Sequence, residues 1–264
     1  GQPKITRLLE RMAWIWQHHL AQLENALECH QTLLAGDPEH LPSVRAAARL
    51  CAATGRYEEL LGFNELEGAL SSSPARKAEL ACASARVARG RLQDEEQAAE
   101  LYRQALVEEP DCTEALEALR GIYRHRGAWD PLARLLQQRL EQGGDPAEAA
   151  PLLHELARLQ LERLEDSAGA EASLETLLGH DPCDEAALEA LLRLYLQGGK
   201  TERAAALLQE AATARGQGPE AARWLTRAAD LKLHLQDDAR AAEGLLRRAL
   251  GYSPGCVQAL CRLE

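Results

Sequence analysis

A regular spacing of proline is the feature that most constrains the fold. Prolines recur at intervals of 36 residues, and where the slot at 218 holds glycine, Pro219 follows directly. A fixed period of this length indicates a repeat protein, in which one supersecondary unit is stacked many times. The prolines in this register are Pro38, Pro74, Pro110, Pro146, Pro182 and Pro254.

A second, longer period shows that alternate repeats differ. Alanine recurs at two places of the sequence pattern, and glycine at a third, at twice the proline spacing and without any insertion. Each such set of equivalent residues is called a register. The unit is therefore a pair of repeats, here called a double repeat, and the chain holds about three and a half of them. The registers are Ala26, Ala98, Ala170 and Ala242; Ala13, Ala85, Ala157 and Ala229; and Gly55, Gly127 and Gly199.

The composition predicts that each repeat is helical. Ala and Leu make up most of the apolar residues, and there is one Phe and one Met. Ala, Leu, Glu, Gln and Arg are strong helix formers, whereas strands prefer β-branched and aromatic residues. We therefore expect no β-sheet.

Residues 184–216 show how one hairpin is built. Asp184 is placed to cap a first helix, and apolar residues follow at the i, i+3, i+4 and i+7 spacing of one helical face. Gly198 and Gly199 end this helix, and Thr201 is placed to cap the second. The apolar residues are Leu188, Leu191, Leu192 and Tyr195.

The alternate hairpins have a longer first helix and a turn without glycine. Ser73 and Pro74 predict a capped start, because proline at the first helical position loses no hydrogen bond. The helix is expected to run to about Arg91, followed by a polar turn at Gln93 and Asp94.

The second helices carry an Ala–apolar–Ala–Pro pattern that resembles the tetratricopeptide repeat, a helical hairpin of about 34 residues. The matching residues are Ala98, Tyr102, Ala105 and Pro110, and again Ala242, Leu246, Ala249 and Pro254. The resemblance implies an all-α fold, an α-solenoid wound as a right-handed superhelix of about seven hairpins plus a partial C-terminal helix. In the family register the repeats are 7–40, 41–74, 79–112, 113–146, 151–184, 185–218 and 223–256, with a partial repeat at 257–264. The interrupted last repeat leads us to expect a fragment of a longer protein.

Charge and cysteine content narrow the function classes. The net charge of −11 disfavours nucleic acid and anionic membrane surfaces, both of which attract basic proteins. No apolar run is long enough to span a bilayer, so we expect no membrane insertion. The seven cysteines are odd in number and irregularly spaced, which predicts free thiols and a cytoplasmic location. The arginine-rich, lysine-poor composition resembles that of bacterial arrays.

No motif for catalysis, metal or cofactor binding is complete. His154-Glu155 begins a metalloprotease motif, but Arg158 stands where the second histidine is needed. Gly216-Gln217-Gly218 lacks the third glycine of a nucleotide-binding loop and the strand before it. We therefore predict a non-enzymatic protein without a metal site or cofactor.

The resemblance places a groove on the first helices of the hairpins. There it implies a partner-binding set of Arg45, Arg49, Arg91, Arg124, His125, Arg163, Arg193, Trp224, Arg227 and His234. One hypothesis is that the arginines bind the carboxylates of an acidic or C-terminal peptide, with Trp224, Met12 and Ile15 as apolar anchors. The alternative is that the arginines pair with glutamates of neighbouring helices.

The leading hypothesis for function is a scaffold that binds a protein or peptide in its concave groove. A carboxylate clamp for chaperones is not expected, because neither Asn25 nor Asn64 falls on a first helix. The alternatives are a regulatory or substrate-recruiting domain of a larger enzyme such as a kinase or transferase, an RNA-binding array, and self-association through the ends of the stack.

Overall fold

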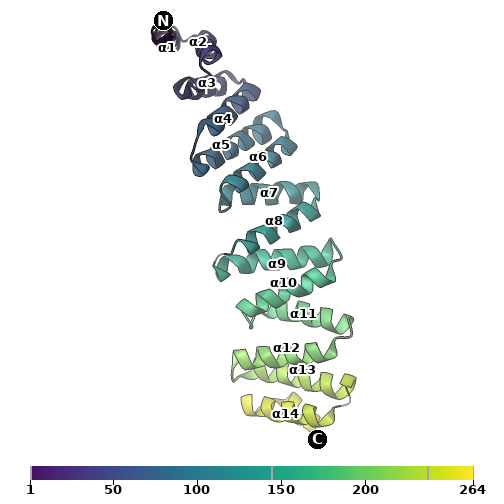
Figure 1. Cartoon of the computed structure of the whole chain (residues 1–264). Helices are drawn as coiled ribbons and strands as arrows, with labels where there is room; N and C mark the ends of the chain where they lie inside the picture. Colours follow the sequence, from purple (N-terminus) through teal and green to yellow (C-terminus); the bar gives the residue numbers. More distant parts are fainter. Residues whose placement is uncertain (1, 144, 237, 264) are drawn as a thin grey trace. The chain divides into compact units, whose positions relative to one another are not determined.

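The computed structural model describes residues 2–143, 145–236 and 238–263. Within these residues all regular secondary structure is helical, which confirms the predicted all-α fold. The fold is an α-solenoid of helical hairpins, and it divides into two compact units, residues 1–128 and 129–264. In each unit the helices follow one another side by side, and each runs back along its predecessor (Figure 1).

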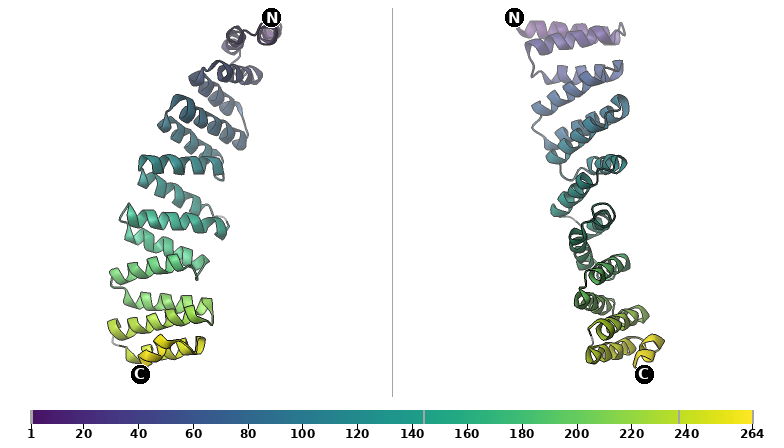
Figure 2. Two further views of the ribbon diagram at one scale, coloured as in Figure 1. Left: turned by 180° about the vertical axis from the view of Figure 1, so that it is seen from behind. Right: turned by 90° about the vertical axis from the view of Figure 1, so that its right-hand side faces the viewer.

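The helices alternate between the first and second positions of a hairpin. Unit 1 contains α1 (Gln2–His18), α2 (Leu23–Gly36), α3 (Leu41–Thr54), α4 (Tyr57–Leu70), α5 (Pro74–Val87) with a π-helical turn (Ala88–Leu92), α6 (Glu95–Glu108) and α7 (Thr113–Arg126). Unit 2 contains α8 (Trp129–Glu141), α9 (Pro146–Glu162), α10 (Ser167–His180), α11 (Glu185–Gln197), α12 (Thr201–Arg215), α13 (Pro219–Gln236), α14 (Ala239–Tyr252) and α15 (Val257–Leu263). Both views in Figure 2 show the helices of each unit stacked as successive layers.

The helix starts follow the predicted capping, with one exception. Asp184 accepts a hydrogen bond from the Ala187 amide at 2.9 Å, and Ser73 accepts one from the Arg76 amide at 3.4 Å. The prediction that Thr201 caps α12 is wrong: the helix begins at this threonine, and Lys200 occupies the capping position without a capping bond from its side chain. Thr201 is therefore the first residue of the helix and lies one position after the cap, although threonine is a favourable capping residue.

The hairpin turns that the structure describes use a residue in the left-handed region. In the shorter hairpins this residue is the predicted glycine, with φ of 76° at Gly55, 64° at Gly127 and 67° at Gly199. Glycine accepts this conformation without a steric penalty. The longer hairpins use other residues for the same task, each one double repeat from the next. They are Ala21 (φ 53°), Gln93 (φ 57°) and Glu165 (φ 54°).

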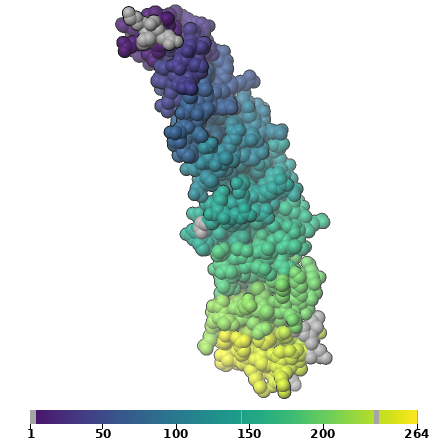
Figure 3. All heavy atoms as spheres, viewed as in Figure 1, coloured from purple at the N-terminus to yellow at the C-terminus, as the bar shows by residue number. Residues whose placement is uncertain are grey.

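Alanine allows the helices to pack closely. The two predicted alanine registers are buried at every copy, with exposed fractions of at most 3%. Because a methyl group fills so little space, neighbouring helices can approach closely at these points. Leucines and a few tyrosines fill the remaining core, and successive hairpins of a unit form a continuous surface (Figure 3).

Candidate functional site

The predicted groove residues divide between the two units. Unit 1 holds Arg45, Arg49, Arg91, Arg124 and His125, and unit 2 holds Arg163, Arg193, Trp224, Arg227 and His234. Nine of the ten are exposed and lie on the first helices of hairpins or in the turns that end them. Their partners show which of these side chains serve the fold.

Arg45 belongs to a buried ionic cluster. Its Nε donates to Oε1 of Glu67 at 2.8 Å, and Arg76 donates to the same oxygen through Nε at 3.1 Å and Nη2 at 2.9 Å. The Glu67 side chain is only 3% exposed. Burial alone would raise the pKa of Glu67, but the hydrogen bonds from Arg76 and Arg45 hold it below its ordinary value. Arg45 therefore links α3 to α4.

Arg91 and Arg163 stack on aromatic rings at equivalent places in the two units. The Arg91 guanidinium lies over the Tyr57 ring, 5.8 Å from its centroid, and that of Arg163 lies 5.0 Å from the Trp129 centroid. Each arginine ends a longer first helix, and each ring belongs to the first residue of the preceding second helix. The two pairs lie one double repeat apart, so this cation–π contact is part of the repeat.

Other predicted groove residues also have partners within their own unit. Arg227 pairs with Glu189, and His125 lies 3.4 Å from a carboxylate oxygen of Glu95. Arg49 and Arg193 occupy equivalent places in the two units, and each donates Nε to a carbonyl group of its own helix, at 3.3 and 3.4 Å. The carboxylate contacts favour the internal-pairing alternative for Arg45 and Arg227.

Trp224 is not an exposed anchor. Its side chain is 8% exposed and packs in the core of unit 2, where the Arg215 guanidinium lies 5.9 Å from the ring centroid. Arg215 is the last residue of α12, the helix that precedes α13. Met12 and Ile15, the other predicted anchors, are 39% and 38% exposed on α1.

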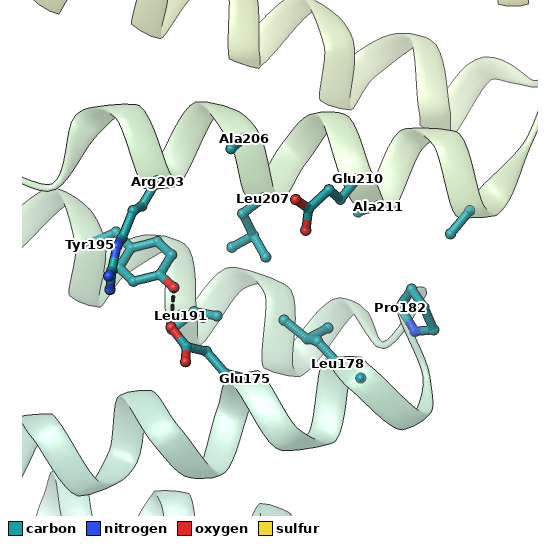
Figure 4. Close-up of a pocket in the computed structure, with 12 residues that line it drawn as sticks. Glu175, Leu178, Pro182, Leu191, Tyr195, Arg203, Ala206, Leu207, Glu210 and Ala211 are labelled. Carbon is teal, nitrogen blue, oxygen red and sulfur yellow. Dashed lines mark hydrogen bonds between the residues drawn. The ribbon is translucent and has the colours of Figure 1, made fainter.

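A cavity of unit 2 that was not predicted lies between the second helices α10 and α12. It has a volume of about 430 Å³ and is bounded by α10, α11 and α12 (Figure 4). Leu178, Leu191 and Leu207 form its apolar floor, and the rim residue Ala206 lies on α12. Gly179 leaves the rim on α10 open, since nothing lies within 4 Å of the place where its Cβ would be.

The two ends of this cavity are polar. At one end the Tyr195 hydroxyl donates to Glu175 at 2.5 Å (Figure 4), and burial together with this carboxylate raises the pKa of Tyr195 far above its ordinary value. The phenol therefore stays protonated and continues to donate to Glu175. Toward the other end Glu210 is exposed, without a charged partner in the part of the chain that the structure describes. Such a cavity can take apolar side chains flanked by a cation.

A second cavity, of about 780 Å³, lies in unit 1 between α4, α5 and α6. Gly62 and Gly68 line it from α4, and no atom lies within 4 Å of either ideal Cβ position. Glycine is disfavoured inside a helix, so its presence on exposed faces of second helices is the sequence signal that could have revealed both cavities.

The described residues contain no candidate metal site and no candidate membrane span. Among the described residues, no three His, Cys, Asp or Glu side chains gather in a way that could hold a metal ion. No helix in the described ranges is both long and apolar enough to cross a bilayer.

Comparison with known proteins identifies the repeat. A family model described as tetratricopeptide repeat matches residues 115–150, which run from α7 through α8 to the first turn of α9. This segment is a tetratricopeptide-type repeat, and the chain as a whole is an array of helical hairpins. No curated protein sequence matches it.

Several solved structures are similar to this chain over most of its length. A tetratricopeptide repeat protein from Parabacteroides merdae is 18% identical, with 98% of each chain covered and a TM-score of 0.38. The C-terminal part of a repeat protein from Cytophaga hutchinsonii is 13% identical, with 97% of this chain and 99% of that chain covered and a TM-score of 0.38. PilF from Pseudomonas aeruginosa is 17% identical, with coverages of 86% and 98% and a TM-score of 0.36. At these scores the superpositions are not close, so site arguments rest on this chain's own residues.

Proposed function

We propose that this tetratricopeptide-type chain is a non-catalytic scaffold that binds a peptide or protein partner, and that the cavity between α10 and α12 takes the partner's apolar side chains. The observation that carries the proposal is an open cavity with a leucine floor. Its volume falls in the range of sites that accept small ligands or a few side chains. Side chains placed there would cover apolar surface that now faces water.

The rim defines which peptides would fit. The Glu175 carboxylate is engaged by Tyr195, whereas Arg203 is held by Glu171 at 3.0 Å. Glu210 is the acid left to meet a partner, so we infer a peptide with one or two apolar side chains followed by Lys or Arg. An exposed ion pair adds little affinity, about 0–1 kcal/mol, and serves mainly to orient the peptide.

The proposal of an acidic partner now rests on Arg49 and Arg193. Both are exposed, and each uses Nε for its own helix, so the terminal nitrogens can receive a carboxylate. Because they lie in different units, we propose them as separate contact points and not as one clamp.

A peptide library displayed on phage and selected on the full chain tests the cavity. We expect enriched apolar–basic motifs whose affinity falls at least tenfold in Ala206→Trp, which fills the cavity from its exposed rim. The matched control is Ala172→Trp, an exposed alanine on α10 that does not line the cavity. Glu210→Gln should weaken binding less, and its effect should shrink as salt is added.

The proposal fails if selected peptides bind Ala206→Trp and the unaltered chain equally well. Circular dichroism of both tryptophan variants confirms that the fold persists, so that a loss of binding reports the cavity itself.

A further inference from the structure

A polar side-chain pair recurs at one place in every double repeat. Its two members are 30 residues apart in sequence, and each pair lies one double repeat from the next. The closest side-chain atoms are 2.7–4.0 Å apart in all four copies. The pairs are Glu10 with His40, Cys82 with Cys112, His154 with Asp184, and Thr226 with Cys256.

The backbone of the repeat brings these side chains together. The first member lies on a longer first helix, α1, α5, α9 or α13. The second caps the next short first helix or directly precedes it: His40 before α3, Cys112 before α7, Asp184 before α11 and Cys256 before α15. Four chemically different pairs meet at this place, so the contact does not depend on the attraction between two particular groups.

In the second copy this place holds two thiols, whose Sγ atoms are 3.7 Å apart. We propose that Cys82 and Cys112 form a dithiol site that a small-molecule disulfide such as oxidised glutathione converts to an intramolecular disulfide. The link would join α5 to the start of α7 within unit 1. Both cysteines are free thiols in the structure, and no other two thiols are in contact within the described ranges.

The exposure of the two thiols sets the order of the steps. Cys112 is half-buried, whereas Cys82 is only 3% exposed. Burial, with the neighbouring Cys112 sulfur, raises the pKa of Cys82 to about 12, so this thiol is a poor first nucleophile. The Cys112 thiolate attacks one sulfur of oxidised glutathione, and a glutathione thiolate leaves.

In the second step Cys82 loses its proton and attacks Sγ of Cys112 in the mixed disulfide, which expels the second glutathione thiolate. The two cysteines together lose two electrons and two protons. Oxidised glutathione takes up the electrons, and the two leaving thiolates take up the protons. Reduced glutathione or another thiol reverses both steps.

The full chain is incubated with oxidised glutathione under native conditions, quenched with N-ethylmaleimide, digested and mapped by mass spectrometry. We expect a peptide pair cross-linked through Cys82 and Cys112, removed by dithiothreitol. Cys82→Ser should keep glutathione on Cys112. In Cys112→Ser, Cys82 should stay reduced, because it is buried and has lost the partner that reacts first.

A second dithiol, introduced at the equivalent place in the last double repeat, tests the proposal without changing Cys82 or Cys112. Thr226→Cys places a second thiol beside Cys256, where the side chains already approach to 4.0 Å, and should yield a second cross-link. The proposal is overturned if Cys112 of the folded, unaltered chain carries glutathione without the link to Cys82. It is also overturned if Cys82 and Cys112 stay fully reduced while the exposed Cys261 is modified.

Discussion

The Glu67 cluster offers a quantitative test of which arginines belong to the fold. In Glu67→Gln the side chain keeps its shape and its acceptor oxygen but loses its charge. Three N–H groups from Arg45 and Arg76 point at that oxygen. A hydrogen bond to a charged acceptor contributes about 1 kcal/mol more than one to a neutral acceptor, so the loss would reach about 3 kcal/mol.

Two effects reduce this figure. The side chains of Arg45 and Arg76 are 50% and 37% exposed, so water screens their attraction to Glu67. The variant also no longer buries a charge, which is costly in itself. We therefore expect Glu67→Gln to lower the free energy of unfolding by about 1–2 kcal/mol at neutral pH, measured by urea denaturation of the full chain with far-ultraviolet circular dichroism.

The pH dependence separates the charge from the shape. The pKa of Glu67 is lower in the folded chain than its ordinary value of 4.5. Its contribution is therefore complete above the ordinary value and is lost as the pH falls through the folded pKa. The stability difference between the two proteins should be constant at neutral pH and close under acidic conditions. A gap that persists unchanged at low pH, or no gap at neutral pH, would refute the ionic account.

A matched pair of arginine variants completes this test. Arg45→Met removes a partner of Glu67 and should cost about 1 kcal/mol, because charge-assisted hydrogen bonds are lost at a buried acceptor. Arg49→Met, one turn along α3, removes only a bond to its own helix and should stay within about 0.5 kcal/mol. Equal costs at the two positions would show that Arg45 has no special structural role.

Three further predictions use the repeat itself. Leu80→Ala should cost about 2–3 kcal/mol and Leu8→Ala below about 1 kcal/mol in urea denaturation, because these leucines, at equivalent places in the repeat, are 7% and 60% exposed; equal costs would contradict this difference in burial. Gln93→Gly should raise the free energy of unfolding by about 0.5 kcal/mol, since it relieves a left-handed residue, and a lower thermal midpoint would contradict this. Cys82→His with Cys112→Asp copies the pair of the next double repeat, so a double-mutant cycle should show favourable coupling of at least about 0.5 kcal/mol; additive effects would show that the two positions do not interact in the variant.

The period in the sequence predicted the helices and the core well, because both depend on spacing alone. A small residue at one place in every double repeat must meet the same neighbour in each copy, and Ala98 and Ala170 are both fully buried. The turns were harder to predict. Gly55 signals its conformation through its residue type, but nothing in Ala21 or Glu165 signals a positive φ, and only their shared place in the repeat connects them.

The candidate site was harder to predict, because the repeat register gives the backbone position of a residue and not the groups that its side chain contacts. Arg45 and Arg49 occupy the same helix, yet one meets a buried carboxylate and the other its own backbone. The partner Glu67 is 22 residues away in sequence, and its burial follows from packing that no local pattern records. Trp224 is likewise buried, with Arg215 over its ring, and its place in the register did not indicate this burial.

The structure also shows how one array can carry different chemistry at equivalent places. The repeat fixes the backbone at the place where Cys82 meets Cys112, and the equivalent side chains meet in the other three copies. Selection can then change the pair without changing the fold, as the acid–histidine contact at Glu10 and the dithiol at Cys82 illustrate. Within such an array a functional side chain is best sought where one copy departs in chemistry from its equivalents. By this criterion the glycines of α4 and the thiols of Cys82 and Cys112 are stronger candidates than the arginines, whose stacking at Arg91 recurs at the equivalent place in the next double repeat.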